Sequence, residues 1–140
     1  MTIQSVMPNL FTDDVERAVS FYRDVLGGVQ TFQSPSEGPA RHVELRLGDA
    51  VIAVSSRAAV RDEGLPDPDT GHPMELVLWC ASADDAVGAV RAAGQHVLIE
   101  PYSGHVSGLR RAYVADPDGN WIALVSSEKA ADALPEDPHG

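Results

Sequence analysis

The spacing of apolar and polar side chains predicts the same series of elements in each half of the chain. In the first half, apolar residues recur at helical spacing up to Gly27, and Asp13 with Glu16 three positions later resembles a capping box at the start of this helix. Residues 42–47 alternate strictly, which is typical of a half-buried strand. The strands expected in this half lie at residues 3–11, 29–33, 42–47 and 51–55.

The second half repeats this order. Ser82 followed by Asp85 predicts a second helix start, and Gly94 is expected just past the helix end because glycine readily adopts a positive φ. Glycine and proline are frequent between the halves, so residues 57–73 are expected to form an irregular linker. The strands expected here lie at residues 74–80, 97–100, 110–114 and 121–125, before a flexible polar tail at 128–140.

Matching segments indicate that the two halves are copies of one unit. Ile52-Ala-Val54 and Ile122-Ala-Leu124 lie 70 residues apart, and the helical pairs Ala18-Val19 and Ala86-Val87 lie 68 residues apart. The expected fold class is therefore α+β, with two βαβββ modules whose curved sheets enclose a central cup and carry their helices on the convex side. A single domain would span residues 1–127, with modules at about 3–56 and 74–127.

Composition narrows the classes of function. The formal net charge of −11 disfavours nucleic acid, whose binding depends on cationic contacts to phosphate, and it disfavours an anionic membrane surface. No apolar run approaches the roughly 20 residues that span a bilayer, and the first residues lack the pattern of a secretory signal. Because Cys80 is the single cysteine, no internal disulfide is expected, and the predicted location is the cytoplasm.

Two motifs resemble those of a known superfamily. The segment Phe11-Thr-Asp-Asp-Val-Glu-Arg-Ala-Val-Ser-Phe-Tyr-Arg-Asp-Val-Leu-Gly27 is similar to the opening signature of the vicinal oxygen chelate superfamily, and Asp116-Pro-Asp-Gly-Asn120 with its following strand is similar to the closing one. This superfamily contains glyoxalase I, extradiol dioxygenases, fosfomycin-modifying enzymes and bleomycin-resistance proteins. The resemblance covers residues 3–127 and implies the fold more specifically than the function.

The resemblance also implies where a metal would lie. Metal enzymes of the superfamily place up to four ligands, usually histidine and glutamate, on four strands inside the cup. The two signatures align these positions with Met7, Ala53, Glu75 and Ala123, of which only Glu75 has a side chain suited to a divalent metal. We therefore expect no metal and no cofactor. One alternative stays open, a non-standard metal site that would use His42, His72 or His105.

Strand alternation from these four positions predicts which side chains line the cup. Both tryptophans of the chain fall on the predicted inward faces, and the small Ala53 and Ala123 would leave space between them. The alternative is that the tryptophans fill the core or a dimer interface. The predicted ligand-binding residues are Met7, Asn9, Phe11, Val51, Ala53, Glu75, Val77, Trp79, Trp121 and Ala123, with Tyr102, Arg111 and Tyr113 at the rim beside a flexible loop at 101–108.

These features favour a binding protein over an enzyme. A cup lined by aromatic side chains would sequester an aromatic antibiotic or metabolite. The net negative charge of the chain is compatible with a ligand that carries a positive charge. The resemblance to the bleomycin-resistance branch implies a homodimer. The alternatives are a lyase, isomerase or dioxygenase, either metal-dependent through non-standard ligands or metal-free with Glu75 as general base, and a regulatory or scaffold domain that binds nothing small.

Overall fold

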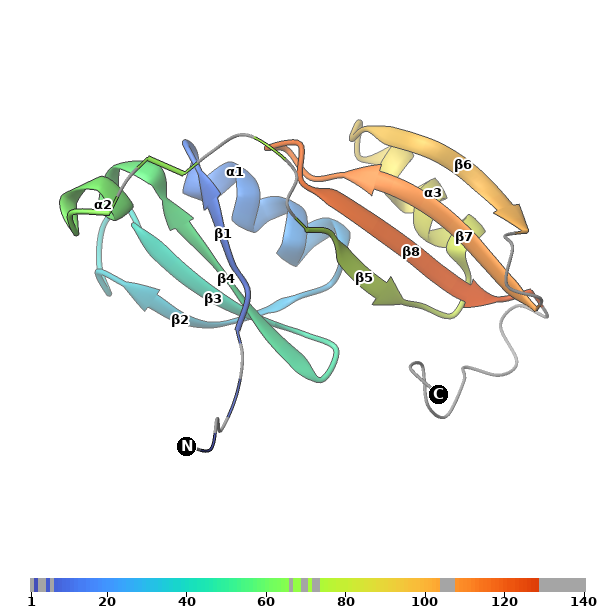
Figure 1. Cartoon of the computed structure of the whole chain (residues 1–140), viewed down its shortest axis with the longest axis horizontal. Coiled ribbons are helices and arrows are strands. Elements are labelled where there is room, and N and C mark those ends of the chain that lie inside the picture. The colour runs from blue at the N-terminus through green and yellow to red at the C-terminus, as the bar shows by residue number, and fades with distance from the viewer. Residues whose placement is uncertain are drawn as a thin grey trace. The chain divides into compact units, whose positions relative to one another are not determined.

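The computed structural model describes residues 2, 5, 7–65, 67–68, 71, 74–103 and 108–128. The chain forms two compact units, Met1–Thr70 and Gly71–Gly140, and each is described here by itself. Each unit is a βαβββ module with one four-stranded mixed sheet (Figure 1). The expected fold class of two βαβββ modules is thereby confirmed, whereas the cup between them stays a prediction. No helix in the described part of the chain is long and apolar enough to cross a membrane.

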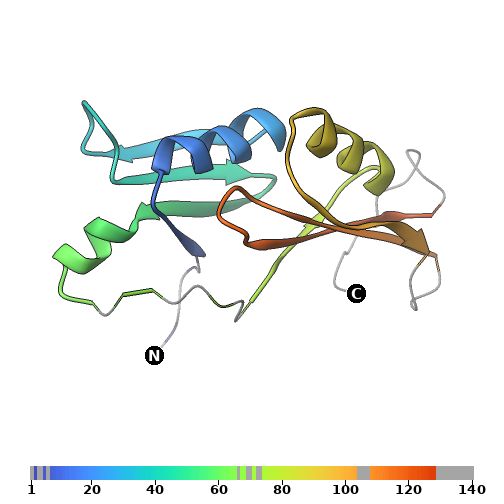
Figure 2. The same ribbon diagram turned by 90° about the horizontal axis from the view of Figure 1, so that it is seen from above.

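The first module is built on a sheet of strand order β1-β4-β3-β2, in which β1 runs parallel to β4 and the other pairs are antiparallel. Helix α1 continues directly into one turn of π-helix, η1, and packs on one face of this sheet (Figure 2). The elements are β1 (Asn9–Thr12), α1 (Val15–Ser20), η1 (Phe21–Val25), β2 (Val29–Ser34), β3 (His42–Leu47), β4 (Ala50–Ser56) and α2 (Arg57–Asp62).

The core of this module lies between the helix and the sheet. Tyr22 and Leu45 are fully buried, and the ring of Phe21 meets that of Tyr22 edge to face with centroids 5.2 Å apart. Where the helix ends, Gly28 N donates to Tyr22 O at 2.8 Å, and a Cβ at residue 28 would lie 2.8 Å from the same oxygen. Only glycine therefore allows the chain to leave the helix this closely.

Three local expectations for the first module are wrong. The first strand, predicted at residues 3–11, begins only at Asn9, and the described residues 5, 7 and 8 are not part of it. The helix is capped one residue later than the predicted capping box, because Asp14 Oδ1 accepts from Arg17 N at 3.1 Å and so replaces Asp13 as the N-cap. The predicted linker also begins with a helix, α2, whose N-cap Ser56 accepts from Ala59 N at 3.3 Å. The glycine and proline residues that suggested a linker follow α2, which leaves residues 57–62 free to be helical.

The second module has the equivalent strand order β5-β8-β7-β6, with β5 parallel to β8. The predicted second helix is confirmed, since Ser82 Oγ accepts from Asp85 N at 3.1 Å and Gly94 has φ of 73° past the helix end. The predicted loop at 101–108 is partly wrong, because β6 extends to Ser103; residues 104–107 lie outside the described residues. The elements are β5 (Leu76–Trp79), α3 (Ala83–Ala92), β6 (Val97–Ser103), β7 (Leu109–Ala115) and β8 (Trp121–Ser127).

Candidate functional site

Each sheet has one face that packs on its module's helix and one that points away from it, which we call the open face. In the second module, Ala83 N donates to Ser126 Oγ at 2.9 Å and Arg110 Nε donates to Asp84 Oδ2 at 3.1 Å, so Ser126 and Arg110 lie on the helix side. Since side chains alternate along a strand, odd-numbered residues of β7 and β8 belong to the open face.

The strand register brings most of the predicted second-module residues onto this open face. One cross-strand row consists of Val77, Ala123, Tyr113 and Ile99. The next row consists of Trp79, Val125, Arg111 and Tyr102, and Trp121 pairs with Ala115 at the far end of β8.

This face is partly exposed and mostly apolar. The exposed fraction is 42% for Trp121 and 48% for Val77, whereas Ala123, which pairs with Val77, is fully buried. Arg111 Nη1 donates to Tyr113 Oη at 3.4 Å, which orients the phenol beside the small Ala123. The face therefore combines large flat rings with two small side chains, Ala115 and Ala123.

Glu75 and Met7 lie just before the first strand of their modules. Both side chains are exposed, Met7 to 40%. An apolar surround would suit Glu75 to act as a general base, whereas among the described residues of its module its side chain is exposed. The role of Glu75 as a base stays a prediction, with less support than the sequence suggested.

The open face of the first module is more polar than predicted. The register gives one row of Asn9, Ala53, Glu44 and Phe32, and a second row of Phe11, Ser55, His42 and Ser34. Asn9, Phe11, Ala53 and, by alternation along β4, Val51 share this face as the sequence predicted. The sequence left open whether His42 and Glu44 project to this face or form a solvated one; the structure places both beside Ser55 and Ala53.

Four of these side chains form one hydrogen-bonded chain across three strands. His42 Nε2 lies 2.9 Å from Glu44 Oε2, and His42 Nδ1 lies 2.7 Å from Ser55 Oγ. Ser55 Oγ in turn lies 2.9 Å from Asn9 Oδ1. Ser55 is 5% exposed, so its hydroxyl is held almost entirely by these partners. We call this set the Asn9–Glu44 chain.

A pocket of about 510 Å³ opens onto the Asn9–Glu44 chain. Helix α2 and the residues after it form one wall, which the sequence could not provide because it predicted a linker there. Arg41 and Asp62 form an ion pair at this pocket. The pocket is lined by Asn9, Phe11, Ser34, Pro35, Arg41, His42, Ser55, Ala59, Val60, Asp62, Glu63 and Leu65.

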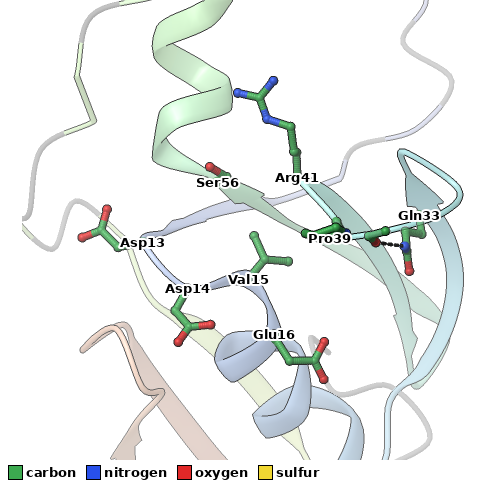
Figure 3. A pocket seen from close by; sticks show the side chains of 10 residues that line it. Asp13, Asp14, Val15, Glu16, Gln33, Pro39, Arg41 and Ser56 are labelled. Carbon is green, nitrogen blue, oxygen red and sulfur yellow. Dashed lines mark hydrogen bonds between the residues drawn. The ribbon is translucent and has the colours of Figure 1, made fainter.

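A second pocket, of about 380 Å³, lies beside the start of α1 (Figure 3). Its acidic side chains do not converge: Figure 3 shows Asp13, Asp14 and Glu16 pointing in different directions. Asp13 lies 3.5 Å from Arg57 Nε, and Asp14 caps the helix. These carboxylates therefore already have local structural roles, and this pocket is not the candidate functional site.

Within the described ranges, no group of three or more histidine, cysteine or acidic side chains is placed to hold a metal ion. His72 and His105, two of the three proposed non-standard ligands, lie outside the described residues. Cys80 Sγ donates to Val125 O at 3.5 Å, and burial raises the pKa of its thiol, which disfavours the thiolate that a nucleophile or metal ligand requires.

Comparison with known proteins places this geometry in a family. The model of the family described as Glyoxalase/Bleomycin resistance protein/Dioxygenase superfamily matches residues 2–124. No curated protein matches the chain.

Solved structures agree with the family match at the level of the fold. TioX from Micromonospora sp. ML1 is 23% identical with a TM-score of 0.71, over 89% of this chain and 98% of that one. A glyoxalase/bleomycin resistance protein/dioxygenase family enzyme from Burkholderia phytofirmans PsJN is 21% identical with a TM-score of 0.74, over 86% and 96%. Virulence protein STM3117 from Salmonella typhimurium is 21% identical with a TM-score of 0.68, over 91% and 99%.

Proposed function

The chain belongs to the glyoxalase/bleomycin resistance protein/dioxygenase superfamily, and from this premise we propose that it is a binding protein that sequesters an aromatic antibiotic or metabolite without a metal. The observation that carries this proposal is the open face of the second module. Trp79, Tyr113 and Trp121 share that face with the small side chain of Ala123. Small-molecule sites are typically apolar surfaces with a few fixed polar groups, here Arg111 and the Tyr113 hydroxyl.

The charge of the chain favours a ligand that carries a positive group. A net charge of −11 attracts cations over a distance, and an indole face binds a cation with about 0.5–2 kcal/mol. Stacking of an aromatic ring on indole adds about 0.5–1.5 kcal/mol beyond the burial of its surface. A planar, cationic compound would gain from both contributions.

The described residues give the enzyme alternative less support. A lyase, isomerase or dioxygenase would need Glu75 as a base or a metal held by His42, His72 or His105. Glu75 is exposed, and His42 is bound to Ser55 and Glu44. The homodimer implied by the bleomycin-resistance branch is part of the proposal, and size-exclusion chromatography with light scattering measures it.

Tryptophan fluorescence tests the proposed function. Titration with bleomycin, and then with a broad panel of aromatic antibiotics, should change the emission of the wild-type protein. Trp121→Ala should remove the larger part of that change and weaken binding, measured by calorimetry, by about two- to tenfold, because one stacking surface is lost.

Leu98→Ala is the matched control. Leu98 is 40% exposed on β6 of the same sheet and is not among the predicted ligand-binding residues. Removal of the Leu98 side chain should leave the affinity for the titrated compound unchanged. Unchanged emission of the wild-type protein across the whole panel, or equal affinity of wild type and Trp121→Ala, would contradict the proposal.

A further inference from the structure

The first module contains a pocket whose residues do not include the aromatic face on which the proposed function rests; two of them, Asn9 and Phe11, are among the predicted ligand-binding residues. Its floor is the polar side of the Asn9–Glu44 chain, and its wall is α2 together with Leu65. The volume of about 510 Å³ lies within the range of small-molecule sites, about 300–1,000 Å³. Phe11, Val60 and Leu65 give it apolar surface, so an organic molecule can occupy it more readily than a simple ion.

We propose that this pocket is a binding site for a primary amine carried on a small apolar body, and that the bound ammonium group replaces a proton on His42. The site lies entirely in the first module. Its residues are therefore not those of the aromatic face of the second module, on which the proposed function rests.

The number of protons in the Asn9–Glu44 chain leads to this proposal. Ser55 has one hydroxyl proton, which can lie toward Asn9 Oδ1 or toward His42 Nδ1 but not both. If it lies toward Asn9, His42 Nδ1 must be a donor; because His42 Nε2 faces a carboxylate, the ring then carries two protons and a positive charge.

The other position of the Ser55 proton leaves two oxygen atoms that can accept hydrogen bonds from a ligand. If Ser55 donates to His42, the ring is neutral and donates from Nε2 to Glu44. Ser55 Oγ and Asn9 Oδ1 then lie 2.9 Å apart with no hydrogen between them. An ammonium group at the pocket floor can donate to both oxygens at once, which removes this repulsion and compensates for the lost proton.

The charges around His42 favour a cation in the pocket. On its own strand it faces Glu44, and from α2 and the residue after it the pocket receives Asp62 and Glu63. Arg41 is the basic residue that lines the pocket, and it is paired with Asp62. From β2 the neighbour is the ring of Phe32, 6.1 Å from the imidazole, which adds no charge. Glu63 therefore gives the pocket a net negative character.

Calorimetry on the full chain with 2-phenylethylamine tests the site, and 2-phenylethanol is the neutral control of equal shape. The amine should bind more tightly than the alcohol. Between about pH 5.5 and 8, where histidine titrates and carboxylates stay ionised, its affinity should rise with pH up to a plateau. On the acid side the slope should approach about tenfold per pH unit, with release of about one proton.

Substitutions of His42, Asn9 and Glu63 separate the contributions of these residues to amine binding. His42→Gln should make the affinity independent of pH across this range, because no proton competes with the amine. Asn9→Leu should weaken the amine by at least about fivefold, since one acceptor of the ammonium group is lost. Glu63→Gln should weaken it by about two- to fivefold, whereas Glu37→Gln, an equal change of charge in the exposed loop outside this pocket, should have no effect.

Several outcomes would overturn the proposal. Equal affinity for amine and alcohol would show that no ammonium site exists. The same pH dependence in wild type and His42→Gln would show that His42 does not exchange its proton, as expected if the Asn9 amide simply turns its NH₂ toward Ser55. If His42→Gln does not fold, the NMR titration of His42 in wild type decides: the amine must move it to lower pH. Trp121→Ala should bind the amine as wild type does, so failure here and failure of the proposed function are distinguishable.

Discussion

Ser55 and Val125 occupy equivalent places in the two modules. Each lies on the central strand of its sheet that follows the last hairpin turn, between an aromatic residue of the first strand and a basic residue of the third. For Ser55 these neighbours are Phe11 and His42, and for Val125 they are Trp79 and Arg111. The Ser55 hydroxyl connects His42 with Asn9, whereas Val125 separates two large side chains without any polar group.

The difference shows what the duplicated backbone determines and what it does not. In both modules the register brings side chains from four equivalent strands into two equivalent rows. The residue types in those rows then decide whether the open face becomes a hydrogen-bonded chain or an aromatic surface. A likeness of fold to other family members therefore says little about which ligand this chain takes.

Substitutions at Ser55 and Val125 should have the largest effect on the free energy of unfolding. Val125→Ser places a hydroxyl at a fully buried position and removes apolar contacts, which should lower the free energy of unfolding by about 2–4 kcal/mol. Ser55→Ala should cost only about 1 kcal/mol, because its partners His42 and Asn9 keep access to water. Urea denaturation measures both, and equal costs would contradict the assignment of the two faces.

The last hairpin turns of the modules give the next comparison. Asp116 is 4% exposed and accepts from Asp118 N, Asn120 N and Asn120 Nδ2 at 2.9, 2.8 and 2.7 Å. Asp116→Asn should lower the free energy of unfolding by about 1–3 kcal/mol, because an amide nitrogen then faces these donors. The matched change Asp49→Asn, in the exposed two-residue turn of the first module, should stay within about 0.5 kcal/mol. Equal effects in urea denaturation would show that Asp116 does not organise its turn.

The smallest effect on stability is expected at the ion pair between α3 and β7. The hydrogen bonds from Arg110 lower the pKa of Asp84 below its ordinary 3.8. A lowered folded-state pKa gives stability that is present above the unfolded value and is lost as pH falls through the folded one. Asp84→Asn should therefore be slightly less stable than wild type at pH about 6, and the difference should vanish in acid. A difference that grows below pH about 4 would have the wrong sign.

Local patterns in the sequence predicted the elements well. The start of α3 depends on neighbouring residues, Ser82 with Asp85, and this prediction is confirmed. Strand alternation likewise assigned Trp79 and Trp121 to one face, because parity needs no knowledge of strand partners. Helix α2 was missed because a short helix of six residues has no full apolar stripe and stands beside many turn residues.

The Asn9–Glu44 chain could not have been derived from the sequence. Asn9 and Ser55 are 46 residues apart and meet only because β1 runs parallel to β4 in one particular register. Moving that register by one residue would turn every side chain of one strand to the other face. His42 and Glu44 were visible as alternate positions, but the partner that makes them a chain comes from another strand.

The chain has two tryptophans, so its ¹⁵N spectrum contains two indole N–H signals, and these report directly on the proposed ligand face. Titration of the labelled full chain with bleomycin, or with the panel compound that changes fluorescence most, should shift the Trp121 indole signal and the amides of β7 and β8. The amides on the exposed side of α3 should stay in place. Saturable binding, shown by calorimetry, that leaves both indole signals unmoved would contradict the account.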